Sequence, residues 1–160
     1  LVAPVPRLFV MTGRTLGGAT VAMMQGMLVV AVCLLAGFRP VNAHALPLAF
    51  LFMALIAFLF AALGTAIGSV LQDMQGFQLI MNFLVMPIFF LSGALFPLTN
   101  LPKVLAGVVS LDPLSYGVDG LRSALIGLSH FGAATDIAIL CAVTVILLGI
   151  GSYLFSRIQI

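Results

Sequence analysis

The stretch that decides the fold runs from Phe90 to Gly127 and reads FLSGALFPLTNLPKVLAGVVSLDPLSYGVDGLRSALIG. It begins in an apolar segment, is interrupted at Phe96-Pro97, and carries four of the charged residues of a chain with six basic and four acidic side chains. The stretch is too long for a tight turn and too apolar for an ordinary solvated loop. Its position relative to the flanking segments therefore determines the architecture.

Two short helices are expected within this stretch, because a helix-start signal occurs twice. A polar capping residue with proline in the first turn precedes a helix at Pro102, and again at Asp112 and Pro113. Gly127 provides a stop for the second helix. Neither helix is long enough to cross a bilayer, so the sequence predicts a re-entrant hairpin over 96–133 that enters the membrane and returns, buried against protein.

Asp119 and Arg122 lie three residues apart on the second of these helices, which is close enough for an ion pair. Two interpretations remain open at this point. A local surface pair contributes less than about 1 kcal/mol. At membrane depth, removing one partner of such a pair costs much more, because the other charge is left unpaired.

The composition places the flanking segments in a membrane. Of the residues, 63% are hydrophobic and 6% are charged, whereas about a quarter are charged in soluble domains. Four long uncharged windows each supply the roughly 20 apolar residues that a crossing needs, and they predict spans at about 16–38, 46–71, 77–95 and 134–155. The expected fold is a single all-α domain over 1–160: a polytopic integral membrane protein with four transmembrane helices, the hairpin before the last span, and both termini on one side.

Small residues within the first two spans indicate close helix contacts. Gly18 and Gly26 lie on one face of the first span, and Gly64 and Gly68 form a GxxxG pattern in the second. Such residues let another helix backbone approach closely.

The opening segment, 1–15, begins with Pro4 and Pro6, and its apolar run from Leu8 to Met11 lies between Arg7 and Arg14. The run predicts a short helix lying along the membrane surface. This helix either anchors in the headgroups through its arginines or docks on another protein. Because the chain opens on leucine, we expect it to start partway through a larger polytopic protein.

The third span contains a proline at position 87, which tends to kink a helix. Asn82, Phe83, Phe89 and Phe90 belong to the same span. Packing is the simpler interpretation of these aromatic side chains, and a wall for an apolar substrate is the alternative that makes them candidate pathway-lining residues.

The motifs that carry catalytic or cofactor chemistry are absent from these 160 residues. The sequence has no GxxxxGK[ST] phosphate loop, no HExxH, no GxSxG and no Cys/His cluster. Cys33 and Cys141 fall within predicted spans, where cysteine packs as a small hydrophobe, and a net charge of +2 gives no indication of nucleic-acid binding. A permease, an ATP-independent channel or carrier, and an integral membrane enzyme remain as function classes.

The segments FLSGALFPLTNLP and DPLSYGVDGLRSALIG together resemble the signature region of type-2 ABC exporter permeases, a group that includes daunorubicin-type drug and lipo-oligosaccharide exporters. The opening APVPRLFVMTGRTLG is similar to the cytoplasmic segment between the second and third spans of that family. The residues that carry the signature are Gly93, Phe96, Pro97, Pro102, Asp112, Pro113, Tyr116, Asp119 and Arg122.

The resemblance implies that the chain corresponds to the last four of six spans, with the hairpin on the extracytoplasmic side. It also implies a multi-pass protein of a bacterial plasma (inner) membrane that exports a hydrophobic or amphipathic drug, lipid or glycan. The residues that would form the coupling helix for a separate ABC ATP-binding subunit are Pro4, Pro6, Arg7, Leu8 and Phe9. The expected partners are that subunit, a second permease in a homodimer or heterodimer, and membrane lipid. ATP and Mg²⁺ would bind the partner subunit, with no cofactor on this chain.

Overall fold

The computed structural model describes residues 7–41, 43–71, 73–95 and 103–157, and all regular elements in these ranges are helical. The expected all-α fold is therefore confirmed. The elements in chain order are α1 (Arg7–Leu35), the 3₁₀ turn η1 (Ala43–Ala45), α2 (Leu46–Val70), α3 (Met74–Leu91), α4 (Lys103–Leu111), α5 (Pro113–Ile126) and α6 (Ala133–Arg157).

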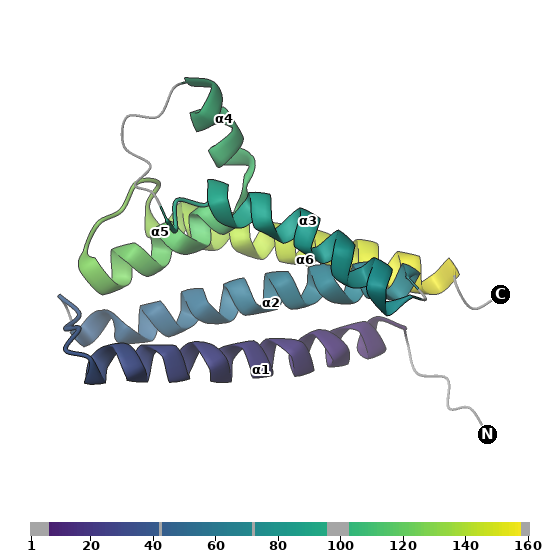
Figure 1. Ribbon diagram of the computed structural model, residues 1–160, viewed down its shortest axis with the longest axis horizontal. Coiled ribbons are helices and arrows are strands. Elements are labelled where there is room, and N and C mark those ends of the chain that lie inside the picture. The colour runs from purple at the N-terminus through teal and green to yellow at the C-terminus, as the bar shows by residue number, and fades with distance from the viewer. Residues whose placement is uncertain (1–6, 42, 72, 96–102, 158–160) are drawn as a thin grey trace.

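Four of these helices are long and apolar enough to cross a membrane, as expected from the sequence. The apolar segments are Phe9–Leu35, Leu46–Val70, Met74–Leu91 and Ala133–Leu154. All four follow the long axis of the molecule (Figure 1). The start of α1, the end of α6 and the α2–α3 connection share one end of the bundle, while the α1–α2 connection and the α4–α5 region share the other.

The separate surface helix expected in the opening segment is not present, because α1 runs without interruption from Arg7 to Leu35. No proline interrupts this range. Met11 is 1% exposed, and a side-chain carbon placed on Gly151 of α6 would meet both Met11 and Ala66 of α2. The expected apolar run is therefore the first part of a spanning helix, and at Met11 this helix packs near both α2 and α6.

The third span also starts earlier than expected, at Met74 instead of residue 77. Asp73 is the N-cap of α3, since its carboxylate accepts hydrogen bonds from the backbone N–H groups of Gln75 and Gly76 at 3.2 and 2.9 Å. An aspartate in this position satisfies N–H groups that have no partner within the helix. The helix then continues through Pro87 to Leu91.

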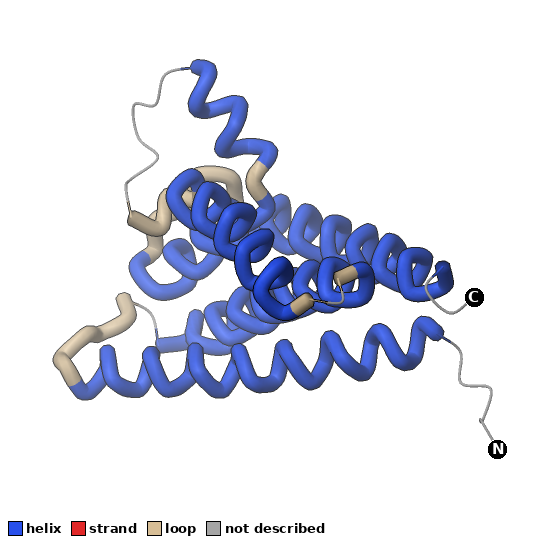
Figure 2. The backbone as a smooth tube through the Cα atoms, turned by 45° about the vertical axis from the view of Figure 1, so that its right-hand side comes forward, coloured by secondary structure: helices blue, strands red, loops and turns tan. Residues whose placement is uncertain are grey.

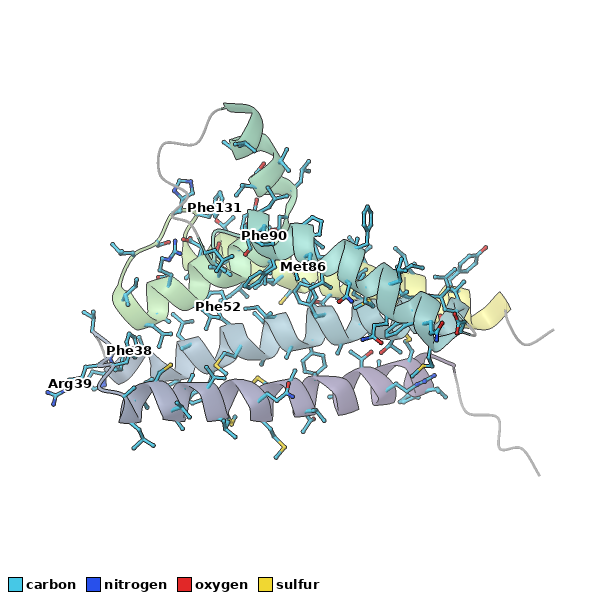
Figure 3. All side chains as sticks on the ribbon, viewed as in Figure 1. Phe38, Arg39, Phe52, Met86, Phe90 and Phe131 are labelled. Atoms are coloured by element: carbon cyan, nitrogen blue, oxygen red, sulfur yellow. The ribbon has the colours of Figure 1, made fainter. Side chains whose placement is uncertain are left out.

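α2 is the central helix, and it contacts α1, α5 and α6 (Figure 2). The most buried cluster contains Phe52 and Leu59 of α2, Tyr116 of α5 and Leu140 of α6. Phe52 points from α2 toward α5 (Figure 3). The sequence predicted close helix contacts at glycines of the first two spans. Gly18 of the first span does allow a close approach to Ala61 of α2.

The two helices predicted within the 90–127 stretch are both present, as α4 and α5. α5 begins after the N-cap Asp112 and ends at Gly127, whose φ of 74° is the left-handed conformation that glycine adopts readily. α4 projects away from the bundle, whereas α5 packs against α2 and α6 (Figure 1). The hairpin thus has one outlying helix and one helix within the bundle.

Close contacts at two glycines fix the register of α5 against α2. Side-chain carbons placed on Gly117 and Gly120 would collide with Ile56 and Phe52, respectively. The two helices are therefore antiparallel, and α5 starts further along α2 than Ile56. Asp112 precedes Gly117, so at about 1.5 Å per residue it lies about 7 Å further toward the C-terminal end of α2 than Ile56. Asp112 is therefore beside the middle of α2, Leu46–Val70.

We expect Gly120→Ala to destabilise the protein by about 1–3 kcal/mol, because the added methyl group meets the fully buried ring of Phe52. Gly107→Ala is the matched control, since nothing lies within 4 Å of the methyl position on α4, and alanine improves helix propensity by up to about 1 kcal/mol. The apparent melting temperature of the purified full-length permease distinguishes the two. Equal melting temperatures for both variants would contradict the close packing of α5 on α2.

Candidate functional site

The start of α5 is held by the side chain of Asp112, which is 6% exposed. Its Oδ1 accepts a hydrogen bond from the Leu114 N–H at 2.9 Å, and its Oδ2 accepts one from the Ser115 hydroxyl at 3.2 Å. Pro113 follows at the first helical position, where no N–H is needed. The buried helix start is thus satisfied by its own capping residue.

Tyr116 connects α5 to the end of α4 and to the loop before α6. Its hydroxyl donates a hydrogen bond to the Ser110 carbonyl oxygen at 2.7 Å. Its ring packs against Phe131, with 4.7 Å between the ring centroids. This contact gives a structural role to one of the signature residues singled out in the sequence.

Asp119 binds the loop between α5 and α6 through an arrangement that we call the Asp119 clamp. Its carboxylate accepts hydrogen bonds from the His130 N–H at 2.8 and 2.9 Å, the Phe131 N–H at 2.8 Å and the Ser129 hydroxyl at 3.3 Å. Asp119 itself is 3% exposed. One buried carboxylate therefore satisfies two loop N–H groups and holds the entry to α6 against α5.

The expected ion pair between Asp119 and Arg122 is not formed. Arg122 instead donates a hydrogen bond from Nη2 to the carbonyl oxygen of Gly93 at 2.8 Å. Gly93 follows the end of α3 and has a φ of 75°. A cation at this position interacts favourably with the C-terminal end of α3, so the two signature charges connect α5 to α6 and to α3 instead of to each other.

The sequence of the chain also matches a known protein family over most of its length. The family model described as ABC-2 type transporter matches residues 1–126. The chain belongs to the ABC-2 type transporter family.

Two relatives illustrate the extent of the similarity within the ABC-2 family. The inner membrane transport permease YadH of Escherichia coli (strain K12) is 30% identical over 140 residues, which cover 88% of this chain and 54% of the relative. Nodulation protein J of Sinorhizobium fredii (strain NBRC 101917 / NGR234) is 29% identical over 134 residues, covering 82% and 50%. The chain thus spans about half the length of the curated relatives that it matches, and no solved structure matches it significantly.

The family and the four apolar helices identify the chain as a multi-pass protein of the inner membrane, with bacterial relatives. Among the signature residues of this ABC-2 chain, Phe96, Pro97 and Pro102 lie outside the described residues. Pro4 and Pro6 of the expected coupling segment also lie outside them. Arg7 and Leu8 form the first turn of α1, and the side chain of Phe9 is 67% exposed.

The four candidate pathway residues occupy one side of α3. At 100° per residue, Asn82 and Phe89 share one angular position, and Phe83 and Phe90 share a neighbouring one. Phe83 is 81% exposed and Phe90 is 54% exposed. All four side chains are exposed, so this face of α3 has no cover from the described residues, and its role in a pathway stays a prediction.

Asp136, in the first turn of α6, is a buried carboxyl group that the sequence analysis did not single out. Its side chain is 0% exposed, and neither carboxylate oxygen has a hydrogen-bond partner among the described residues. Its position in the first turn of a predicted span was visible in the sequence, but its complete burial was not. In the part of the chain that the structure describes, no group of three or more metal-ligating side chains is present.

We expect Asp119→Ala to lower the free energy of unfolding by about 3 kcal/mol or more, because two backbone N–H groups lose a buried, charged acceptor. Asp73→Ala is the control, since Asp73 is an exposed N-cap whose loss costs about 1 kcal/mol. Asp119→Asn keeps one acceptor oxygen and should lie between the two. Thermal unfolding of the full-length permease measures the relative stabilities of the three variants. An Asp119→Ala variant as stable as Asp73→Ala would contradict the Asp119 clamp.

Proposed function

We propose that the chain forms part of the transmembrane subunit of an ATP-driven exporter, which moves a hydrophobic or amphipathic drug, lipid or glycan while a separate subunit hydrolyses ATP. The observation that carries this proposal is the ABC-2 family match over 1–126, which includes both the opening segment and most of the hairpin. The absence of a phosphate loop from these 160 residues fits ATP binding on another polypeptide, which would also hold Mg²⁺.

The proposed contact with the ATP-binding subunit is the start of α1, with Arg7, Leu8 and Phe9 and the preceding Pro4 and Pro6. Two observations support this role. Phe9 is largely exposed, whereas Met11, two residues later, is buried against α2 and α6. A movement at the start of α1 would therefore be passed directly to the central helix and to the last span.

The bundle also offers a mechanical connection to its opposite end. α6 runs from its contact with Met11 to its entry loop, where the Asp119 clamp joins it to α5. Arg122 then joins α5 to the end of α3. In this proposal, closure of the ATP-binding subunits displaces α1, and the displacement reaches α5 and α3 through packed contacts.

The substrate would leave between two permeases, in a homodimer or a heterodimer. The exposed side of α3, with Asn82, Phe83, Phe89 and Phe90, is the proposed wall of this pathway. Its aromatic side chains suit an apolar cargo, and Asn82 adds one group capable of hydrogen bonding.

The alternative function is that of an ATP-independent channel or carrier. Asp136 is the observation that favours it, because buried carboxylates in membrane proteins often mark ion or proton pathways. A carrier of this kind would transport in vesicles without an ATP-binding subunit.

We expect Phe9→Ala to weaken association with the ATP-binding subunit at least ten-fold, which corresponds to about 1.4 kcal/mol. The reason is that truncating a central aromatic side chain removes much of the energy of an interface. The measurement is co-purification of the full-length permease with its ATP-binding subunit, followed by substrate-stimulated ATP hydrolysis in proteoliposomes.

Phe38→Ala is the matched control, because Phe38 follows the other end of α1 (Figure 3). It should leave both association and stimulation unchanged. Normal association of the Phe9→Ala variant would contradict the coupling role of α1, and transport that needs no ATP-binding subunit would establish the alternative function.

A further inference from the structure

A cavity of about 340 Å³ lies between α1, α2 and α3, toward the end of the bundle where the α2–α3 connection is found. Its volume falls within the roughly 300–1,000 Å³ of ligand sites. The residues that line it include Arg14 and Gly18 of α1, Gly64 and Gly68 of α2, and Met74 and Phe77 of α3.

Glycines create this space. Side-chain carbons placed on Gly64 and Gly68 would find their nearest neighbours at 3.9 Å, on Met81, and at 3.5 Å, on Phe77, which is ordinary contact. The sequence predicted that the GxxxG pattern of α2 allows a close approach by a neighbouring helix. The structure shows only ordinary side-chain contact between these glycines and α3. Instead, the pattern leaves a groove whose walls are apolar apart from Thr65, whose hydroxyl donates a hydrogen bond to the Ala61 carbonyl oxygen.

Arg14 gives the cavity a positive charge at its rim. Its side chain is exposed, and within the described ranges no ion pair or hydrogen bond engages it. Among the residues that the structure describes, no acidic side chain lines the cavity. Asp73 is near in sequence to Met74 and Phe77, but its carboxylate accepts hydrogen bonds from the first N–H groups of α3.

The position of Arg14 along the bundle suits a lipid headgroup. It lies near the start of the apolar segment Phe9–Leu35, and arginines near the end of a spanning helix extend toward the headgroup region. The guanidinium offers five donors in a planar arrangement that matches phosphate. An amphiphile with an anionic head and an apolar tail would therefore be complementary to both the rim and the walls.

We propose that this cavity binds an anionic phospholipid, whose phosphate contacts Arg14 while an acyl chain lies along the groove between α2 and α3. Basic pockets between transmembrane helices bind anionic headgroups in this way. The site is separate from the proposed coupling and pathway residues, and it does not depend on the proposed transport activity. A second cavity, of about 290 Å³ between α1, α2 and α5, has only apolar lining residues and lacks the charge that would select such a head.

The test uses the full-length permease in nanodiscs that contain either phosphatidylglycerol in phosphatidylcholine or phosphatidylcholine alone. Native mass spectrometry after release from the nanodiscs counts the retained lipids. We expect the wild-type protein to retain phosphatidylglycerol in preference to phosphatidylcholine. Arg14→Gln should reduce that preference about five-fold, the effect of one basic side chain near an anionic surface.

Two further variants separate charge from space. Arg39→Gln removes a cation at the opposite end of the bundle (Figure 3) and should leave the preference unchanged. Gly64→Leu fills the groove but keeps Arg14, and it should reduce retention of the lipid. Retention by Arg14→Gln equal to that of the wild type, or no retained phosphatidylglycerol on the wild type because another part of the protein fills the cavity, would overturn the proposal.

Discussion

A helix of fourteen residues is about 21 Å long, which is shorter than the roughly 30 Å of hydrocarbon in a bilayer. α5 therefore has to start inside the protein, beside the middle of α2, and its first N–H groups cannot rely on water. Asp112 satisfies one of them, and Pro113 removes another. Most of the surrounding arrangement follows from the need to keep this short helix buried with its polar groups satisfied.

The same constraint explains why the charges of the hairpin connect separate segments. Asp119 binds the backbone N–H groups of His130 and Phe131, and Arg122 binds the carbonyl oxygen of Gly93, so each charge joins α5 to a connecting segment. Gly117 and Gly120 give α5 the narrow face that allows it to lie directly on α2. The hairpin is thus attached to α2 by packing, and to α3 and α6 by hydrogen bonds. This combination makes the end of the bundle a single mechanical unit in the proposed transport cycle.

The sequence predicted well those features that depend on neighbouring residues. The Asp-Pro start and the glycine stop of α5, together with the four apolar spans, are local signals, and the structure contains all of them. The features that were wrong depend on distant contacts. α1 continues through Met11, which is buried beside Gly151 of α6, and this contact joins residues that are far apart in the sequence.

The partners of the charged residues were unpredictable for the same reason. Spacing placed Asp119 and Arg122 within reach of each other, yet each of them binds a backbone group from another segment, at Phe131 and Gly93 respectively. The burial of Asp136 likewise depends on how α6 packs at its start. Helical spacing predicts which side chains are neighbours on the same helix. The partners of Asp119 and Arg122 instead come from other segments that pack against α5.

The re-entrant path of α4 and α5 is tested most directly by labelling single cysteines with a membrane-impermeant maleimide. Cys33 and Cys141 are replaced by alanine in a full-length permease free of other cysteines, and the exposed positions Val41, Gln75 and Leu128 are each changed to cysteine in turn. The structure predicts that Val41→Cys and Leu128→Cys react from the same side of the membrane, and Gln75→Cys from the other. Labelling of Leu128→Cys from the side of Gln75→Cys would show that the hairpin crosses the membrane, and it would contradict the account.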